Sequence, residues 1–259
     1  MMKRRWELPG AVAVGAVMVV AGLAGAGTTA EAAGTASHYT LTFDTDYYSG
    51  DSHQLVHWAR CTKINGDRKT NVIDYTVNPA GHDYRVKLVK RGIRKLHDAS
   101  GLTFRYRGRT SYIPHTVNGL FQALDQRHKT HADLVIAWAL QGTGAHASNL
   151  LQGVEQGVGT IKWASGPTSQ LRILEGAVVM ERGQSLPKGF QARGSEGTLL
   201  LHELGHAVGL QHVSDPTQIM FPTLGTESPA GYAAGDRTGL AKVGSDTRCL
   251  TTPPLPPSN

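Results

Sequence analysis

Cysteine is scarce in this sequence, which holds only Cys61 and Cys249 among its 259 residues. No cysteine follows the apolar run near the N-terminus, and this excludes lipid attachment at that point. In an oxidising compartment the natural pairing is one disulfide that ties the start of the domain to its end, and two free thiols are the alternative. Closure of so long a loop stabilises the folded state by about 4–5 kcal/mol in the chain-entropy model.

Long hydrophobic runs are absent except near the N-terminus. Residues 3–5 are basic, residues 11–23 form an apolar run, and residues 30–32 read Ala-Glu-Ala. These are the three parts of a secretory signal peptide over residues 1–32. The run is short and rich in glycine and alanine for a membrane-spanning helix, so an uncleaved anchor is the alternative. We expect a secreted, extracellular protein with no membrane association once the signal is removed.

The excess of basic over acidic residues is modest. The formal net charge is +6, and it is +5 without residues 1–32, because that segment carries three cations and two carboxylates. The remaining basic residues are spread along the chain and indicate a solvated surface, so we expect no nucleic-acid partner. The length fits one medium domain without a second one, and no aromatic-lined accessory module indicates a polymer substrate.

One short motif is rich in residues that can bind a metal ion. It reads HELGHAVGLQH and spans residues 202–212. On a helix, His202 and His206 lie one above the other on the same face, so both imidazoles can bind one metal ion. Gly209 falls where the helix should end, because glycine adopts the left-handed conformation without steric cost, and His212 can then turn back as a third ligand. Three neutral imidazoles leave the fourth position of Zn²⁺ open, which is typical of a catalytic site.

Glu203 supplies the second part of the predicted chemistry. It follows His202 by one residue and is rotated by about 100° around the helix, so its carboxylate can reach a zinc-bound water without binding the metal. We expect Glu203 to be the general base in the hydrolysis of peptide bonds in a protein or peptide substrate, with one catalytic zinc ion. The alternative is a catalytically silent, zinc-bearing binding or adhesion module, which has no need of Glu203.

The spacing of this motif resembles that of the metzincins, a clan of zinc endopeptidases with a methionine-containing turn below the metal. Met220, in Ile-Met-Phe-Pro, follows His212 by eight residues, a spacing similar to that of the matrixin branch. The resemblance implies that Met220 forms an apolar floor under the histidines, the alternative being a methionine that fills an ordinary core gap. It also implies that Asp236, in Gly-Asp-Arg-Thr-Gly-Leu, braces this turn. Val213 departs from the matrixins, which usually carry serine or threonine there.

The resemblance implies an α+β fold of the zincin type. We expect a mixed twisted sheet with two long helices in an upper subdomain, and an active-site zinc helix, a Met-turn and a C-terminal helix in a small lower subdomain. The catalytic domain would span residues 57–250, after a polar leader or short pro-segment at 33–56 and before a proline-rich tail at 251–259. A faint similarity to an astacin inhibitory latch lies at Tyr48 to Asp51, and a plain solvated loop is the alternative. We expect a monomer.

Hydrophobic periodicity predicts the order strand, helix, strand, strand. Residues 72–77 and 102–106 alternate as strands do, and residues 132–139 are apolar enough for a central strand. Residues 84–99 have apolar positions at helical spacing, and Gly101 follows the end. The basic residues on the other side of this helix indicate a solvated face: Lys87, Lys90, Arg91, Arg94 and Lys95.

Two further extended segments are predicted before the motif. One of the segments 157–163 and 171–180 should be the edge strand along which a peptide substrate binds by strand addition. Ser195 is a plausible N-cap for the zinc helix. The loop 142–159 is rich in glycine, but it lacks the histidine and aspartate spacing of the additional metal sites of matrixins, so neither calcium nor a second zinc is indicated.

Overall fold

The computed structural model describes residues 36–44, 54–64, 67–117, 120–122, 132–165 and 171–249. The expected signal peptide, the latch at Tyr48 to Asp51 and the proline-rich tail lie outside the described residues. None of the described helices is both long enough and apolar enough to cross a membrane.

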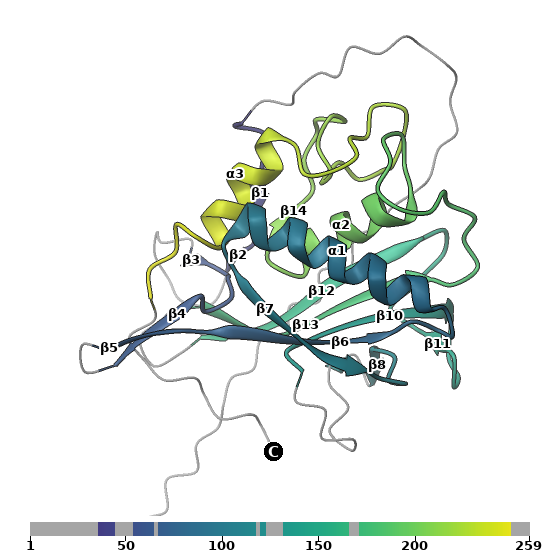
Figure 1. The fold of residues 1–259 in the computed structure, drawn as a ribbon, viewed down its shortest axis with the longest axis horizontal. Helices are drawn as coiled ribbons and strands as arrows, with labels where there is room; N and C mark the ends of the chain where they lie inside the picture. Colours follow the sequence, from purple (N-terminus) through teal and green to yellow (C-terminus); the bar gives the residue numbers. More distant parts are fainter. Residues whose placement is uncertain are drawn as a thin grey trace, which may run out of the picture.

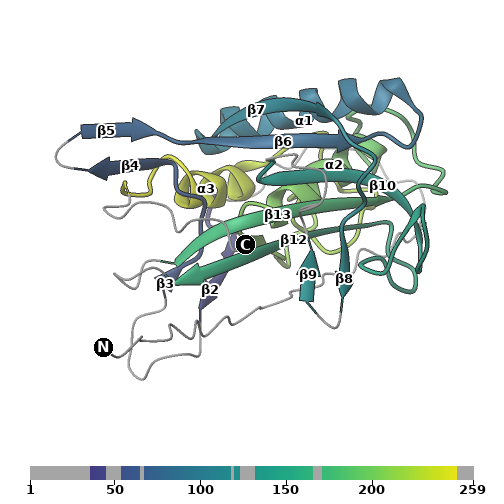
Figure 2. The ribbon, with the colours of Figure 1, turned by 90° about the horizontal axis from the view of Figure 1, so that it is seen from below.

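The central element is a twisted sheet whose main strands lie in the order β12-β13-β10-β6-β7. Figure 2 shows the five strands in this order, with α1 beside β6 and β7. Four of them run parallel to one another: β6 (Val72–Asn78), β7 (Thr103–Arg109), β10 (Leu134–Gln141) and β13 (Leu171–Glu181). β12 (Gly157–Ser165) closes one side of the sheet and runs antiparallel to β13, and the short β11 (Ala147–Ser148) pairs with the end of β10. The sheet is therefore mixed, as predicted.

Three helices are present in the described part of the chain: α1 (Asp83–Ser100), α2 (Glu196–His206) and α3 (Ala234–Val243). Figure 1 shows α1 and α2 on the same side of the sheet. A Cβ on Gly92 of α1 would lie 3.2 Å from the side chain of Leu200 and 3.3 Å from that of Leu204, so the two helices pack closely at this glycine. The helix α2, which carries the motif, thus packs against α1, and α1 with 18 residues is the longest of the three described helices.

The predicted helix and strands match the structure closely. The apolar positions of α1, among them Val86, Val89, Ile93 and Leu96, are buried against the sheet and α2. The helix ends at Gly101, whose φ of 68° is left-handed and whose N–H donates to the carbonyl of His97 over 2.8 Å. β6 covers the segment predicted at 72–77, and β7 and β10 overlap the other two predicted segments but begin one and two residues later. The α+β fold expected from the sequence is confirmed.

Short two-stranded ladders surround the main sheet. They are formed by β1 (Thr40–Leu41) with β14 (Leu210–Gln211), β2 (Phe43–Asp44) with β3 (Gln54–Leu55), β4 (Cys61–Ile64) with β5 (Asp67–Thr70), and β8 (His115–Val117) with β9 (Leu120–Gln122). Cys61, at the start of β4, forms a disulfide with Cys249, six residues after the end of α3. The bond links residues 188 positions apart in the sequence.

The described parts of the polar leader contact the domain. β1 pairs antiparallel with β14, so Thr40 lies opposite Gln211 and Leu41 opposite Leu210. Val56 is fully buried in the core. The sequence did not indicate these contacts, because two-residue strands have no measurable period and the apolar residues around Val56 form too short a run to show one.

Candidate metal centre

The helix α2 is fixed at its N-terminus by a reciprocal cap. The Ser195 hydroxyl accepts a hydrogen bond from the Thr198 amide over 3.2 Å, and the Thr198 hydroxyl oxygen accepts one from the Ser195 amide over 2.7 Å. This pair satisfies two of the amides that a helix start leaves unpaired. Ser195 thus has the N-cap geometry that the sequence predicts.

A buried carboxylate anchors the same end of α2 to the rest of the domain. Glu196 accepts hydrogen bonds from the Trp138 indole over 2.9 Å and from the Tyr84 hydroxyl over 2.8 Å, and Arg85 lies 3.4 Å away. These partners come from β10 and α1, so the glutamate ties the first turn of α2 to both. No sequence pattern indicates this cluster, since a glutamate in a first helical turn is common and its partners Trp138 and Tyr84 lie far away in the chain.

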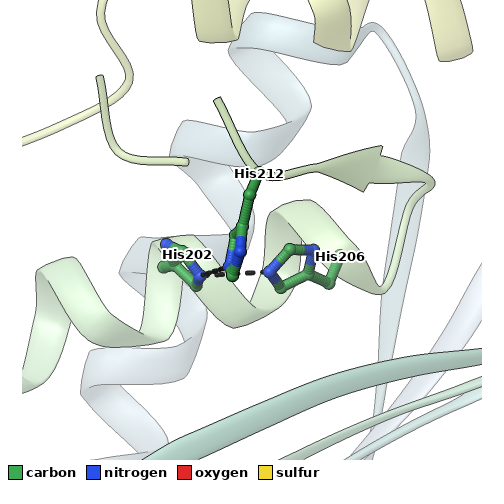
Figure 3. A group of neighbouring side chains, drawn as sticks. All are labelled: His202, His206 and His212. Atoms are coloured by element: carbon green, nitrogen blue, oxygen red, sulfur yellow. Dashed lines mark hydrogen bonds between the residues drawn. The ribbon is translucent and has the colours of Figure 1, made fainter. Parts of the chain in front are cut away.

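The three motif histidines converge on one point. Nε2 of His202 lies 3.0 Å from Nε2 of His206 and 3.1 Å from Nε2 of His212. Figure 3 shows His202 and His206 on one side of α2, with His212 reaching toward them from the segment that follows. Gly209, with a φ of 106°, turns the chain so that His212 faces the other two histidines, because only glycine adopts that conformation without strain. One ligand atom from each histidine lies within 4.8 Å of the others.

Backbone carbonyls fix the tautomers of two of these rings. Nδ1 of His202 lies 2.7 Å from the Ile219 carbonyl, and Nδ1 of His206 lies 2.8 Å from the Leu210 carbonyl. Since a carbonyl only accepts, each Nδ1 carries the proton, and in the neutral ring Nε2 presents a lone pair to the centre. Lone pairs that face one another at this distance repel, and a cation between them removes the repulsion.

Burial keeps the three imidazoles neutral. It lowers the pKa of His202 to about 3 and that of His212 to about 4, and it lowers the pKa of His206 well below the usual value. Neutral imidazole is the form that binds zinc. Nitrogen ligands about 2.05 Å from a tetrahedral zinc ion lie roughly 3.3 Å apart, close to the separations found here. The donor set, its tautomers and its spacing therefore fit zinc.

Glu203 is fully buried beside this cluster and has no hydrogen-bond partner for either carboxylate oxygen among the described residues. Burial raises its pKa well above the usual value. The charge of Glu155 adds to this effect, and the backbone amide of Gly159 opposes it, although this amide lies near the carboxylate without reaching hydrogen-bond geometry. A buried carboxylate with both oxygens unpaired is costly in a structural role. It is suited to accepting a proton from a molecule bound next to it.

Two glycines of the edge strand β12 allow the sheet to approach α2. A Cβ on Gly157 would lie 2.7 Å from Oε1 of Glu203, and one on Gly159 would lie 2.8 Å from Cβ of His206 and would overlap the backbone of Glu203. Real Cβ atoms essentially never come so close. The backbone of β12 therefore lies directly against the motif residues, which the sequence did not reveal.

The segment after His212 packs beneath α2. Met220 is buried, and a Cβ on Gly205 would collide with its sulfur, so the methionine touches the helix between the two histidines. Asp236 accepts hydrogen bonds from the amides of Ile219 over 2.7 Å and of Met220 over 3.2 Å. The structure thus places Met220 beneath α2, and Asp236 against the turn that carries Met220.

The strand before His212 is held by the N-terminal segment. The Thr42 amide donates to the Gly209 carbonyl over 2.8 Å, and the Gln211 side chain donates to the Thr42 hydroxyl over 2.7 Å. His38 bonds to Asp215 on the other side of the third histidine. We call residues 38–42 the strap, because they cross both ends of the turn that carries His212.

The fold and the metal centre together define a metzincin, which is one of the zinc peptidase clans. The defining features are the mixed sheet, the helix with two histidines, the third histidine after a glycine turn and the methionine below the helix. Comparison of the sequence with known protein families supports this class, because the family model for Matrixin matches residues 69–243. The chain belongs to the matrixin family. In general terms, the family gives it the function of a zinc metalloprotease.

Proposed function

We propose that this protein is a secreted, zinc-dependent endopeptidase in which Glu203 is the general base. The observation that carries the proposal is the buried carboxylate of Glu203, which has no partner of its own beside three histidines whose lone pairs converge. A site that only holds zinc needs the histidines, but it has no use for an unpaired buried acid, which reduces stability. The expected signal peptide at residues 1–32 and the disulfide between Cys61 and Cys249 support secretion.

His202, His206 and His212 would hold the ion. When bound, zinc supplies Lewis acidity, which polarises a carbonyl group and makes water acidic near neutral pH. Glu203 takes a proton from the attacking water and passes it to the leaving amine. Burial raises the pKa of Glu203 above its usual value, which makes the carboxylate a stronger base toward the attacking water.

The edge strand β12 would hold the substrate. It is the last strand on its side of the main sheet, and no described strand pairs with its outer edge. An extended peptide can add to such an edge through backbone hydrogen bonds. Because Gly157 and Gly159 bring this strand against Glu203 and His206, a peptide along it would pass the proposed catalytic residues.

The test is hydrolysis of unfolded casein by the purified secreted protein, with and without a zinc chelator. We expect cleavage that the chelator stops, and a loss of at least about 100-fold in Glu203→Gln, which keeps the size of the side chain but removes the base. Glu181→Gln, the same replacement at the end of β13 and outside the cluster, is the control and should retain activity.

The zinc content of each variant is measured alongside activity. One zinc ion per chain in both the wild type and Glu203→Gln, with cleavage only by the wild type, is the result that the proposal requires. One zinc ion per chain without cleavage of casein, or equal cleavage by Glu203→Gln, would contradict the assignment of the base. The first of these results would favour a silent zinc-bearing binding module.

A further inference from the structure

The imidazole of His202 is joined to a buried carboxylate through one peptide group. Nδ1 of His202 donates a hydrogen bond to the Ile219 carbonyl over 2.7 Å. The N–H of that same peptide group belongs to Met220, and it donates to Oδ1 of Asp236 over 3.2 Å. A peptide group is one conjugated unit, so a negative charge at its N–H increases the electron density on its carbonyl oxygen. We call this arrangement, from Asp236 through the peptide group to His202, the relay.

The other carboxylate oxygen of Asp236 has a structural role. Oδ2 accepts hydrogen bonds from the Ile219 amide over 2.7 Å and from the Ala233 amide over 2.9 Å. Ala233 is the N-cap of α3, so these two bonds attach the turn that carries Met220 to the start of that helix. The side-chain oxygen of an asparagine could accept both of them. The bond from Met220 needs a second acceptor oxygen, which a carboxylate has and a side-chain amide lacks.

The carboxylate of Asp236 is shielded from water and is ionised in weakly basic solution. The residue is buried. Burial raises its pKa to about 6, the three backbone amides oppose this rise, and the charge of Asp215 adds to it. At pH 8 the group therefore carries a negative charge. Hydrogen bonds to an ionised acceptor are stronger than neutral ones, and successive bonds in a chain strengthen one another by about 10–30%.

His206 provides a comparison within the same metal centre. Its Nδ1 donates to the Leu210 carbonyl over 2.8 Å, nearly the length of the bond from His202. The N–H of that peptide group belongs to Gln211, in β14, which pairs with β1. No carboxylate in the described part of the chain bonds to the Gln211 amide. The two histidines of α2 thus have the same kind of bond at Nδ1, but only that of His202 continues to an ionised group.

We propose that Asp236 is a positioning residue that strengthens His202 as a metal ligand by polarising the peptide group between Ile219 and Met220. A carbonyl with more negative charge holds the Nδ1–H more firmly, which fixes the ring and leaves more electron density on Nε2, the nitrogen that faces the metal position. This role goes beyond holding the turn in place, because it requires the charge of Asp236 as well as its shape. The inference rests on the metal-binding role of His202 in the proposed function and makes no use of the base.

The first test uses the metal-free wild type at pH 8, isotope-labelled in its histidines. In nuclear magnetic resonance spectra, the proton of an N–H group lies further downfield when its hydrogen bond is stronger. We expect the Nδ1 proton of His202 downfield of that of His206, with each resonance assigned from its loss in His202→Gln or His206→Gln. Equal positions of the two resonances, or the reverse order, would overturn the proposal. This measurement needs no substitution of Asp236, so it decides the question even where variants at that position fold poorly.

The second test uses Asp236→Asn, which keeps one oxygen for the two amides that bond to Oδ2 and removes the acceptor for Met220. We expect the Nδ1 proton of His202 to move upfield while that of His206 stays in place. Zinc affinity, measured by competition with a fluorescent chelator, should fall about tenfold, at the lower end of the effects that outer contacts have on metal ligands.

The matched control is Asp133→Asn, the same substitution at another carboxylate that accepts a backbone amide. Asp133 accepts a hydrogen bond from the Asp74 amide over 2.8 Å, and burial raises its pKa as well. It lies next to β10 in the main sheet and does not belong to the relay. We expect this variant to change neither histidine resonance and to bind zinc as tightly as the wild type. Far-ultraviolet circular dichroism verifies the fold of each variant.

Two results with Asp236→Asn would overturn the proposal. Movement of both histidine resonances would show that the turn has merely loosened. A loss of zinc affinity without movement of the His202 resonance would show that the effect does not pass through the relay. The relay and the proposed function fail on separate readouts, because the resonances are measured without metal and the hydrolysis of casein is not part of this test.

Discussion

At the scale of single residues, hydrogen bonds and burial determine the protonation of the histidines in the metal centre. The carbonyls of Ile219 and Leu210 fix which nitrogen of His202 and His206 is protonated. Burial then keeps the rings neutral. Such outer contacts orient metal ligands and typically change metal affinity by 10–100-fold when they are lost. The metal-binding state is thus prepared by the fold itself.

The neutral histidines predict how stability changes with pH in the metal-free protein. The folded-state pKa of His212 is about 4, below the usual 6.5 of the unfolded chain. Between these values the unfolded chain binds a proton that the folded chain does not, so the contribution of His212 to the free energy of unfolding falls as pH falls from about 6.5 to about 4. Above pH 6.5 this contribution is constant.

Urea unfolding of the chelated protein at pH 7.5, 5.5 and 4.5 tests this prediction. The difference between the wild type and His212→Gln isolates the histidine from other titrating groups. We expect the wild type to lose more stability than the variant on acidification. Parallel pH profiles for the two proteins would show that His212 titrates normally in the folded state.

The histidine motif and its glutamate could be identified from the sequence because they depend on spacing within one helix and the turn after it. Glu196 could not, because its meaning depends on Trp138 and Tyr84, which only the folded chain brings near. The same holds for Gly157 and Gly159, which look like any glycines in a small-residue segment. Local geometry is readable from the sequence, and contacts between distant segments are not.

At the scale of elements, the close approach of β12 to α2 depends on glycine. Gly159→Ala would place a methyl group into the backbone of Glu203 and the side chain of His206. We expect a loss of about 1–3 kcal/mol in the free energy of unfolding, a typical cost of overpacking, together with reduced proteolysis. Gly225→Ala is the matched control, because a Cβ there meets nothing within 4 Å. Equal stability of the two variants in urea would contradict the close approach.

The strap predicts the role of the leader. If residues 38–42 hold the turn that carries His212, deletion of residues 1–44 should weaken zinc binding about tenfold, as the loss of outer contacts does elsewhere. Competition with a fluorescent zinc chelator measures this affinity. The alternative, that residues 33–56 form an inhibitory pro-segment, predicts higher proteolytic activity after the deletion with zinc binding unchanged. The two readouts separate the two roles.

Among the elements, those with a full period were predictable and the shortest ones were not. α1 and β6 show their period over six or more residues, and β10 is a continuous apolar run, so the positions of all three followed from the pattern of apolar residues. β1, β3 and β14 have two residues each, and their pairing depends on partners far along the chain. The sequence also left open which extended segment was the edge strand, and the sheet order identifies it as β12.

At the scale of the whole molecule, the disulfide links the start of the described domain to its end. The Cα atoms of Cys61 and Cys249 lie 4.7 Å apart, although the two residues are 188 positions apart in the sequence. The bond therefore closes a loop over most of the chain. Replacement of both cysteines by serine should reduce the free energy of unfolding by about 2–5 kcal/mol. Chemical unfolding of the double variant measures this loss. Unchanged stability would show that the folded contacts alone already hold the two ends together.

The same bond has a consequence if the protease cuts other copies of itself. The three helices of the described residues, and every described strand from β5 to β14, lie between the two bonded cysteines. One cut in an exposed loop of this region, such as that around Arg182 and Gly183, therefore releases no fragment. Autolysis would yield nicked molecules that run as one band on a gel without reductant and as two bands after reduction. Ageing of a stored preparation would thus go unnoticed unless the sample is reduced before electrophoresis.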